Sequence, residues 1–427
     1  MKKWLQRKGI LSSAILVVTP LLFFIVAFTW ESTGDSLLNP LIPHQQSWGG
    51  KSNVSNTSVP SVLCDLAVGG TDIHLVWKEN SGLNANIHFK NKAKEDAGWS
   101  SALDLTATTA GQCLNPAIAV VENGTSDRIH VVWDDKSQGN RDILYRKSLD
   151  GGSTWDNPLG SGPDSITNDT YDATHPDIAI AGTIPHVVWH GVPPGYTENQ
   201  VFYSQDPAGT GVSWTAPSTL STTPANVNEF PAIAVDGSNR IHVTWHQGAT
   251  PNEVIKYRRF TGTWSSVQSL SGSGSTHSDI AAKGNDVYVV WNTKLSDTQY
   301  RVWYRRSSDG GGTWQPAALI ATVATTLISG FPSPRVSIDA ADNVHVVWHA
   351  VVGLDKPEIW YSQSTDWSSV VNISQTSDES QVASIGTDSG GDVHVAWQEQ
   401  VGGRWDIFYI RTVPTGGIYL PIITKNR

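Results

Sequence analysis

Nine residues of this sequence are candidates for binding or catalysis, and each lies at one of two kinds of position in a repeated pattern. Histidines follow tryptophans that end short apolar runs. Histidines, aspartates and one arginine stand at the starts of a second set of apolar runs. Imidazole transfers protons near neutral pH, carboxylates act as acids or bases, and guanidinium binds carboxylates through a planar fork. The candidate ligand-binding residues are Asp65, His175, Asp177, His190, His246, His277, Asp279, Arg335 and His349.

These positions belong to two sets of predicted β-strands. Runs such as Ile129 to Trp133 have the period-2 pattern of a strand. Such a run ends in tryptophan seven times, at intervals of 46 to 57 residues, and an aromatic residue follows 12 to 14 residues later. A repeat of this length, built from short strands, is typical of a propeller blade, a four-stranded sheet that needs neighbours to bury both faces. We therefore predict an all-β fold, a seven-bladed β-propeller over residues 47–411.

The last blade lacks an outermost strand of its own. In other repeats an element such as Trp264-Ser-Ser follows the second aromatic strand, and residues 47–56 have this form but precede the first blade. We predict that this N-terminal strand closes the last blade, because closure removes two free sheet edges. The predicted blades are 61–105, 113–163, 174–221, 229–271, 277–320, 332–374, and 381–411 with 47–56.

The starts of inner strands and the ends of second strands share one face of a propeller, which we call the mouth. The nine candidates therefore converge there, and they differ from blade to blade, with the histidines concentrated in blades 3 to 6. The alternative is a mouth that is polar only because it is hydrated. If a ligand binds, we expect its binding to change between about pH 5 and 8, where histidine titrates.

The chain ends carry separate signals. Four basic residues within positions 2–8 precede an uncharged apolar stretch from residue 10 to 30. Residues 1–30 are therefore predicted to be one hydrophobic helix, a retained signal anchor or a cleaved signal peptide, which places the rest outside the cytoplasm, membrane-anchored or secreted. Residues 31–46 read as a linker. Residues 412–427 form an apolar tail that either packs along an outer strand or serves as a recognition tag.

The formal net charge of −10 argues against nucleic acid and against electrostatic docking to anionic lipid. We predict a monomer with no cofactor and no metal. Cys64 and Cys113, the only cysteines, start the inner strands of adjacent blades. Two alternatives stay open for them: a disulfide, which an extracytoplasmic location permits, or two separate buried thiols.

Two turns carry the pattern S-x-D-x-G-x-T-W, and Ser204 to Trp214 is a third copy with an insertion. The chain thereby resembles the sialidase-like (BNR or Asp-box) β-propeller superfamily. The motif is a folding device, because the carboxylate can bond the turn's own N–H groups and glycine tolerates positive φ. The resemblance implies that these turns lie opposite the ligand face. The structural Asp-box residues are Ser148, Asp150, Gly152, Trp155, Ser307, Asp309, Gly311 and Trp314.

A further set of histidines occupies one position in six blades. A residue repeated around a whole ring cannot form one convergent site, so we interpret these as structural hydrogen-bonding groups between strands or blades. They are His74, His130, His186, His242, His345 and His394.

The sialidase apparatus itself is not evident. The resemblance implies three arginines, the first in an F/Y-R-I-P motif, but the sequence has no such motif and places only Arg335 on the expected ligand face. We therefore expect a non-sialidase member, a glycan- or protein-binding module at the cell surface. The alternative is a glycan-active enzyme, a glycoside hydrolase or polysaccharide lyase that uses the His/Asp/Arg cluster at the mouth.

Overall fold

The structure is a computed structural model that describes residues 47–413 except 83, 95–97, 107–111, 124–125, 138, 157–162, 168–169, 223–224, 297, 325–331 and 352–355. The predicted targeting segment, the linker up to residue 46 and the tail from residue 414 lie outside the described residues. In the described part of the chain, no helix is long and apolar enough to cross a membrane.

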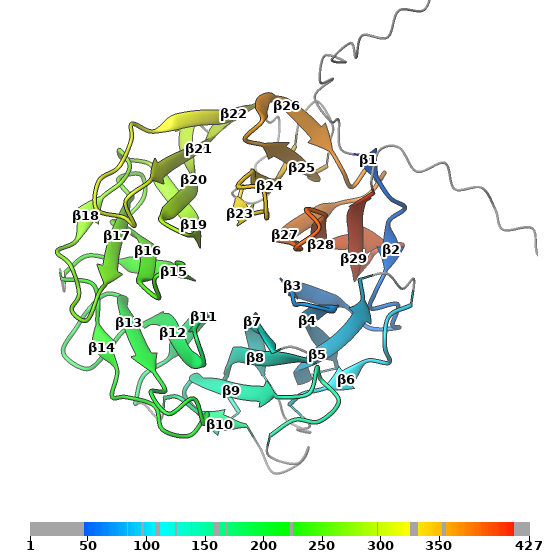
Figure 1. The fold of residues 1–427 in the computed structure, drawn as a ribbon, viewed down its shortest axis with the longest axis horizontal. Helices are drawn as coiled ribbons and strands as arrows, with labels where there is room; N and C mark the ends of the chain where they lie inside the picture. The colour runs from blue at the N-terminus through cyan, green and yellow to red at the C-terminus, as the bar shows by residue number, and fades with distance from the viewer. Residues whose placement is uncertain are drawn as a thin grey trace, which may run out of the picture. The chain divides into compact units, whose positions relative to one another are not determined.

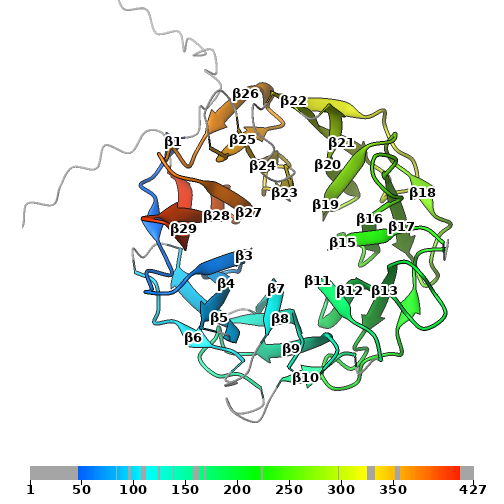
Figure 2. The same ribbon diagram turned by 180° about the vertical axis from the view of Figure 1, so that it is seen from behind.

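The described residues form seven antiparallel sheets arranged as blades around an axis, seen from both ends in Figures 1 and 2. The innermost strands are β3 (Ser61–Val68), β7 (Cys113–Asn123), β11 (Ala173–Ala181), β15 (Asn228–Val235), β19 (Ser275–Lys283), β23 (Arg335–Ile338) and β27 (Ser380–Thr387). The second strands are β4 (Asp72–Ser81), β8 (Ser126–Asp135), β12 (Ile184–Gly191), β16 (Ile241–Gln247), β20 (Asp286–Ser296), β24 (Val344–Ala350) and β28 (Val393–Val401). The predicted seven-bladed propeller is confirmed.

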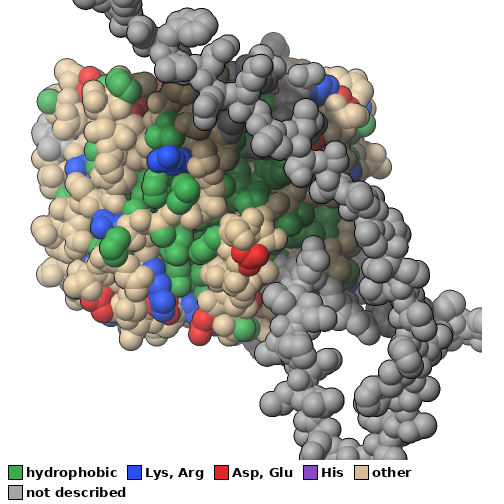
Figure 3. All heavy atoms as spheres, turned by 90° about the horizontal axis from the view of Figure 1, so that it is seen from above, with side chains coloured by type: hydrophobic (Ala, Val, Ile, Leu, Met, Phe, Trp, Pro, Cys, Tyr) green, Lys and Arg blue, Asp and Glu red, His purple; other side chains and the backbone are tan. Residues whose placement is uncertain are grey.

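The third strands are β5 (Asn84–Ala93), β9 (Asp142–Ser148), β13 (Gln200–Gln205), β17 (Val254–Phe260), β21 (Gln299–Ser307), β25 (Glu358–Gln363) and β29 (Arg404–Val413). The outer strands are β6 (Leu103–Asp104), β10 (Asp164–Ser165), β14 (Ser218–Thr219), β18 (Gln268–Ser269), β22 (Ala318–Ala324) and β26 (Asp366–Asn372), with β1 (Ser47–Trp48) and β2 (Ser52–Asn53) in the last blade. The longer β22 and β26 expose Leu319 and Val370, and hydrophobic side chains gather on this side of the rim (Figure 3).

Closure of the ring follows the prediction. Ser52 pairs with Tyr409 and Asn53 with Phe408, so β2 lies along β29, and β1 pairs with the last two residues of that strand. Strand β29 continues to Val413, whereas the sequence predicted the propeller to end at residue 411. The last blade is thus built from both ends of the described chain.

Aromatic residues hold each blade to the next. The seven tryptophans of the second strands are at most 2 % exposed. A second tryptophan, before or within each outer strand, packs against the third-strand aromatic of the preceding blade. The pairs, with centroid separations, are Trp155–Phe89 (5.1 Å), Trp214–Tyr145 (5.1 Å), Trp264–Tyr203 (4.9 Å), Trp314–Tyr257 (4.9 Å), Trp367–Tyr304 (5.0 Å), Trp48–Tyr361 (4.9 Å) and Trp99–Tyr409 (5.2 Å). The same contact therefore recurs at every blade boundary.

The repeated histidines are structural, as predicted. In five blades a hydrogen bond joins Nδ1 of the second-strand histidine to the hydroxyl of the third-strand tyrosine: His130–Tyr145 (2.6 Å), His186–Tyr203, His242–Tyr257, His345–Tyr361 and His394–Tyr409 (each 2.7 Å). In the first blade Phe89 has no hydroxyl, and Nε2 of His74 instead lies 2.9 Å from Asp127 of the next blade.

The two cysteines do not form a disulfide. Both thiols are free and buried, and they belong to different clusters of the core. Burial raises the pKa of both thiols. The structure therefore has the second alternative, two separate buried thiols, because the two side chains pack into the cores of different blade boundaries.

The Asp-box turns are self-contained. Asp309 accepts hydrogen bonds from the Ser307 hydroxyl (2.7 Å) and from the Thr313 N–H and hydroxyl (2.9 and 2.7 Å). Asp150 has the same partners in its own turn. A Cβ on Gly152 would come 2.7 Å from the Phe89 ring, and its φ is +91°. The turn therefore needs glycine both for its conformation and for the approach of the neighbouring blade.

Replacing Asp309 with alanine should lower the free energy of unfolding by about 1 kcal/mol, because the N–H and hydroxyl donors of the turn lose their shared acceptor. Binding at the mouth should not change, since the turn follows a third strand and lies at the opposite end of the ring. Urea unfolding measures the first effect, and the affinity for any ligand found to bind the mouth measures the second. Asp309→Asn, which keeps an acceptor oxygen, is the control. Loss of binding at unchanged stability would give the Asp-box a functional role.

Candidate functional site

The mouth is lined by a repeated irregularity of the inner strands. Six of them have a register shift against the second strand, with a residue of positive φ at the shift. Such bulges re-aim a side chain, and non-glycine residues adopt this conformation only where the surroundings hold them in it. The residues are Leu63 (φ 55°), Asn115 (50°), His175 (52°), Phe230 (51°), His277 (49°) and Val382 (51°).

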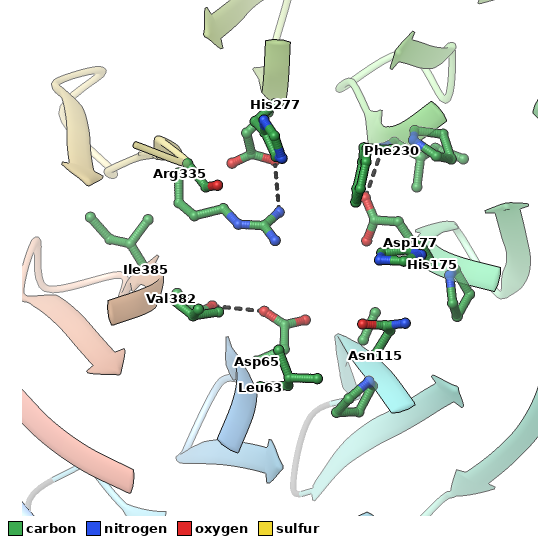
Figure 4. A pocket seen from close by; sticks show the side chains of 18 of the residues that line it. Leu63, Asp65, Asn115, His175, Asp177, Phe230, His277, Arg335, Val382 and Ile385 are labelled. Carbon is green, nitrogen blue, oxygen red and sulfur yellow. Dashed lines mark hydrogen bonds and ion pairs between the residues drawn. The ribbon is translucent and has the colours of Figure 1, made fainter. Parts of the chain in front are cut away.

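These residues surround a cavity on the axis with a volume of about 280 Å³, lined by all seven inner segments. Figure 4 shows their side chains arranged around the centre, with the guanidinium of Arg335 extending into it. The Arg335 side chain is 45 % exposed and lies 3.6 Å from Asp279. Burial opposes its charge, but the carboxylates of Asp279, Asp65 and Asp177 outweigh this effect and raise its pKa.

The three axial aspartates tie neighbouring blades together. Asp65 accepts a hydrogen bond from the N–H of Ile118 (2.9 Å), Asp177 from Ile233 and Asp279 from Val336 (both 2.8 Å), each in the next blade. Burial raises the pKa of Asp177 to about 7 and also raises that of Asp279. These carboxylates lie in the predicted site, but the fold already uses them: the second oxygen of Asp65 accepts from the Ser384 hydroxyl (2.7 Å) and that of Asp177 from the N–H of Ile178 (2.9 Å).

The histidines of blades 3 to 5 gather around a phenylalanine. Ring centroids lie 4.6 Å apart for His175 and Phe230, 4.9 Å for Phe230 and His277, and 5.4 Å from Phe230 to both His190 and His246. His175 and His190 stack on each other at 4.9 Å. We call these five residues the Phe230 platform. The structure thus brings together four of the five predicted histidines, while His349 has no ring contact with the platform among the described residues.

Burial lowers the pKa of most of these imidazoles. The pKa falls to about 4 for His175 and His349 and to about 3 for His190 and His277, with burial as the first cause in each case. The expectation that the mouth histidines titrate between pH 5 and 8 is therefore wrong for these four, because a buried imidazole has little water around it to stabilise its charged form.

A polar cluster from blade 2 borders the platform. Asp134, fully buried, accepts hydrogen bonds from Asn115 and from the Arg141 guanidinium, both at 2.8 Å. Burial raises its pKa to about 6. Arg141 is thus a second arginine at the mouth, where only Arg335 was predicted. It was missed because it lies in the loop between second and third strands, which opens onto the same face.

Phe230 was not predicted as a site residue, because its side chain does not titrate and offers no hydrogen bond. A signal was present: Phe230 precedes Pro231 as Asn115 precedes Pro116 and His175 precedes Pro176. When the starts of the inner strands are aligned by their prolines, these three residues share one position, and that position is the site of the bulge.

One group of potential metal ligands exists among the described residues. Single ligand atoms of Asp72, His74 and Asp127 lie within 4.8 Å of one another at the face opposite the mouth. Asp127 is already engaged by His74 and by the N–H of Gly70 at 2.9 Å. A Cβ on Gly69 would come 1.9 Å from this carboxylate, so glycine here makes room for it. The group therefore acts as a contact between the first two blades.

Comparisons with known proteins identify the fold. No family model matches the sequence, and no curated protein matches it. Solved structures with this fold include an α-L-arabinofuranosidase from Fusarium graminearum (TM-score 0.50, 12 % identity, 86 % of this chain and 96 % of that one). Others are a Dyadobacter fermentans protein of unknown function (0.49, 10 %, 86 % and 100 %) and a Trypanosoma rangeli sialidase (0.44, 12 %, 85 % and 60 %). The chain has the sialidase-like seven-bladed propeller fold, as its Asp-boxes predicted.

Proposed function

We propose that the mouth binds a glycan through the Phe230 platform. The observation that carries this proposal is the cluster of one phenyl and four imidazole rings at the rim of the axial cavity. Sites for small ligands combine aromatic surfaces with a few oriented polar groups. A sugar presents C–H faces that pack on such rings and hydroxyls that hydrogen-bond to their edges.

The protonation state of three platform histidines, His175, His190 and His277, suits hydroxyl groups, because burial lowers their pKa values. A neutral imidazole offers one donor and one acceptor nitrogen, which matches the dual character of a hydroxyl. We propose an extracytoplasmic protein, anchored or secreted through residues 1–30, which fits recognition of an external glycan.

Hydrolysis of the glycan is the second candidate, favoured by two carboxyl groups with divergent pKa values. Burial raises the pKa of Asp177 to about 7. His246 and Asn199 hydrogen-bond to Glu229 and lower its pKa to about 2. Such a split suits a general acid and an ionised base or nucleophile. The fold neighbour with a TM-score of 0.50 is an arabinofuranosidase seen with an iminosugar inhibitor, which is consistent with this candidate.

One experiment tests both candidates. Binding to a glycan array should fall at least about tenfold in Phe230→Ala, because the platform loses its central ring. Phe260→Ala, which removes a partly buried ring from third strand β17, should keep binding. Release of reducing sugar, measured in parallel, separates the candidates: turnover lost in Glu229→Gln with binding retained supports hydrolysis. Array binding that is equal in wild type and Phe230→Ala contradicts the glycan site.

A further inference from the structure

We propose that the ligand is a linear, uncharged polysaccharide whose chain crosses the mouth from one radial groove to another, with the Phe230 platform between them. This inference rests on the proposed glycan binding and adds the length, course and charge of the glycan. Two cavities outside the axial one carry it.

The first cavity, the 2/3 groove, lies between the mouth loops of blades 2 and 3 and has a volume of about 530 Å³. One of its residues contacts the platform directly, and a second contacts Glu229, whose carboxylate lies 3.7 Å from His246. The Thr174 hydroxyl lies 3.1 Å from Nε2 of His190 and 3.2 Å from Nδ1 of His175. The Asn199 side chain donates to Glu229 at 2.5 Å. The inner end of the groove therefore opens at the platform. Its lining is Lys136, Asn140, Asp172, Thr174, Val192 and Asn199.

The second cavity, the 4/5 groove, lies between the mouth loops of blades 4 and 5 and has a volume of about 230 Å³. Its inner end is Thr276, which precedes His277 as Thr174 precedes His175. The Thr276 hydroxyl donates to the side-chain oxygen of Asn292 at 3.1 Å. Its lining includes Thr250, Glu253, Thr276, Lys294, Leu295 and Ser296.

The two grooves occupy equivalent places in the repeat and flank the platform. Thr174 adjoins its first histidine and Thr276 its last, while Phe230 contacts the rings of both His175 and His277. The 2/3 groove, the Phe230 platform and the 4/5 groove thus form one binding track across blades 2 to 5. A single sugar fills only its centre, whereas an extended chain occupies all three parts.

The grooves also indicate the charge of the bound polysaccharide and which faces of its sugar rings contact the protein. Each contains one lysine and one carboxylate: Lys136 and Asp172, 3.8 Å apart, in the first, and Lys294 and Glu253 in the second. Balanced charges favour an uncharged ligand over a polyanion such as a uronan. Each groove also presents one exposed aliphatic side chain, Val192 (39 %) and Leu295 (43 %), suited to the apolar face of a sugar ring.

The test uses the full chain and an array of neutral linear glycans, each printed from one sugar to about eight. Affinity should rise with length by at least about tenfold. Val192→Trp and Leu295→Trp, which fill the grooves, should each remove that gain and leave binding of the shortest bound glycan unchanged. Val401→Trp is the matched control, since Val401 has a similar exposure of 41 % but lines neither groove. Thermal unfolding checks that each variant is folded.

The outcomes separate this inference from the proposed function. Binding that depends on Phe230 but not on length, or Val192→Trp behaving as Val401→Trp, overturns the track and leaves the glycan site standing. Preference for polyuronides over neutral chains overturns the uncharged ligand. Binding to no glycan at all overturns both.

Discussion

A chain that lacks residues 47–56 is expected to lose cooperative folding. The segment supplies both outer strands of the last blade and several long-range contacts: Lys51 pairs with Glu399 at 2.7 Å, and Asn53 donates to Asp406 at 2.8 Å. Val54 is 2 % exposed in the core. Without residues 47–56, strand β29 has an unpaired edge, and the boundary with blade 6 loses the contact between Trp48 and Tyr361. The loss is of the order of the whole stability of a typical domain, about 5–15 kcal/mol.

A point substitution gives a graded version of the same effect. Trp48 packs edge-on against Tyr361 at 4.9 Å, so Trp48→Ala should cost about 2–3 kcal/mol, less than a fully buried tryptophan because Trp48 is only half-buried. Thermal and urea unfolding measure both variants. Deletion of residues 31–46 is the control, because it keeps both closing strands. A melting temperature unchanged by loss of residues 47–56 would contradict closure by this segment.

The fold was predictable because its determinants are local and repeated. The tryptophan at each second-strand end, the aromatic in each third strand and the serine-rich outer element recur with the blade. Even closure followed from counting these parts, since the missing outer element of blade 7 and the surplus one at residues 47–56 have the same form. The disulfide alternative was not decidable this way, because the packing of Cys64 and Cys113 into separate clusters depends on contacts between blades.

The site was predictable in position but not in detail. Strand polarity alone assigned His175, His190, His246 and His277 to one face. Their mutual contacts depend on Phe230 and on left-handed bulges, which no periodicity of apolar residues reveals. The axial aspartates were assigned as ligand groups from residue type. Their hydrogen bonds to N–H groups of the next blade form only when the blades assemble into a ring. The sequence of a single repeat therefore does not predict them.

Acidification from pH 7 to 4 is expected to destabilise the protein steeply. Six histidines have pKa values of about 3 or 4 in the folded chain, in each case with burial as the first cause: His130, His175, His186, His190, His277 and His349. The unfolded value is about 6.5. Between about pH 4 and 6.5 the unfolded chain therefore binds more protons, so stability is present above that window and is lost as pH falls through it.

Carboxyl groups with raised pKa values, such as Asp134, Asp177 and Asp279, act in the opposite direction. The raised pKa values of Asp134 and Asp177, about 6 and 7, make the folded chain bind protons that the unfolded chain lacks near pH 5, which favours folding on acidification. Near pH 5 the six histidines outweigh Asp134 and Asp177, so the chain takes up protons on unfolding and its stability falls as pH falls. The histidine contribution therefore determines the sign.

Urea unfolding at pH 7, 6 and 5 measures this slope directly. His349→Gln should reduce it by about one proton, because this residue lies outside the ring contacts of the platform and its imidazole is buried, with no partner for Nδ1 in the described part of the chain. Stability that stays constant from pH 7 to 5 would mean that these imidazoles are hydrated or paired in solution. The neutral, hydroxyl-binding platform would then lose its physical basis, so the pH profile of stability also tests the chemistry proposed for the mouth.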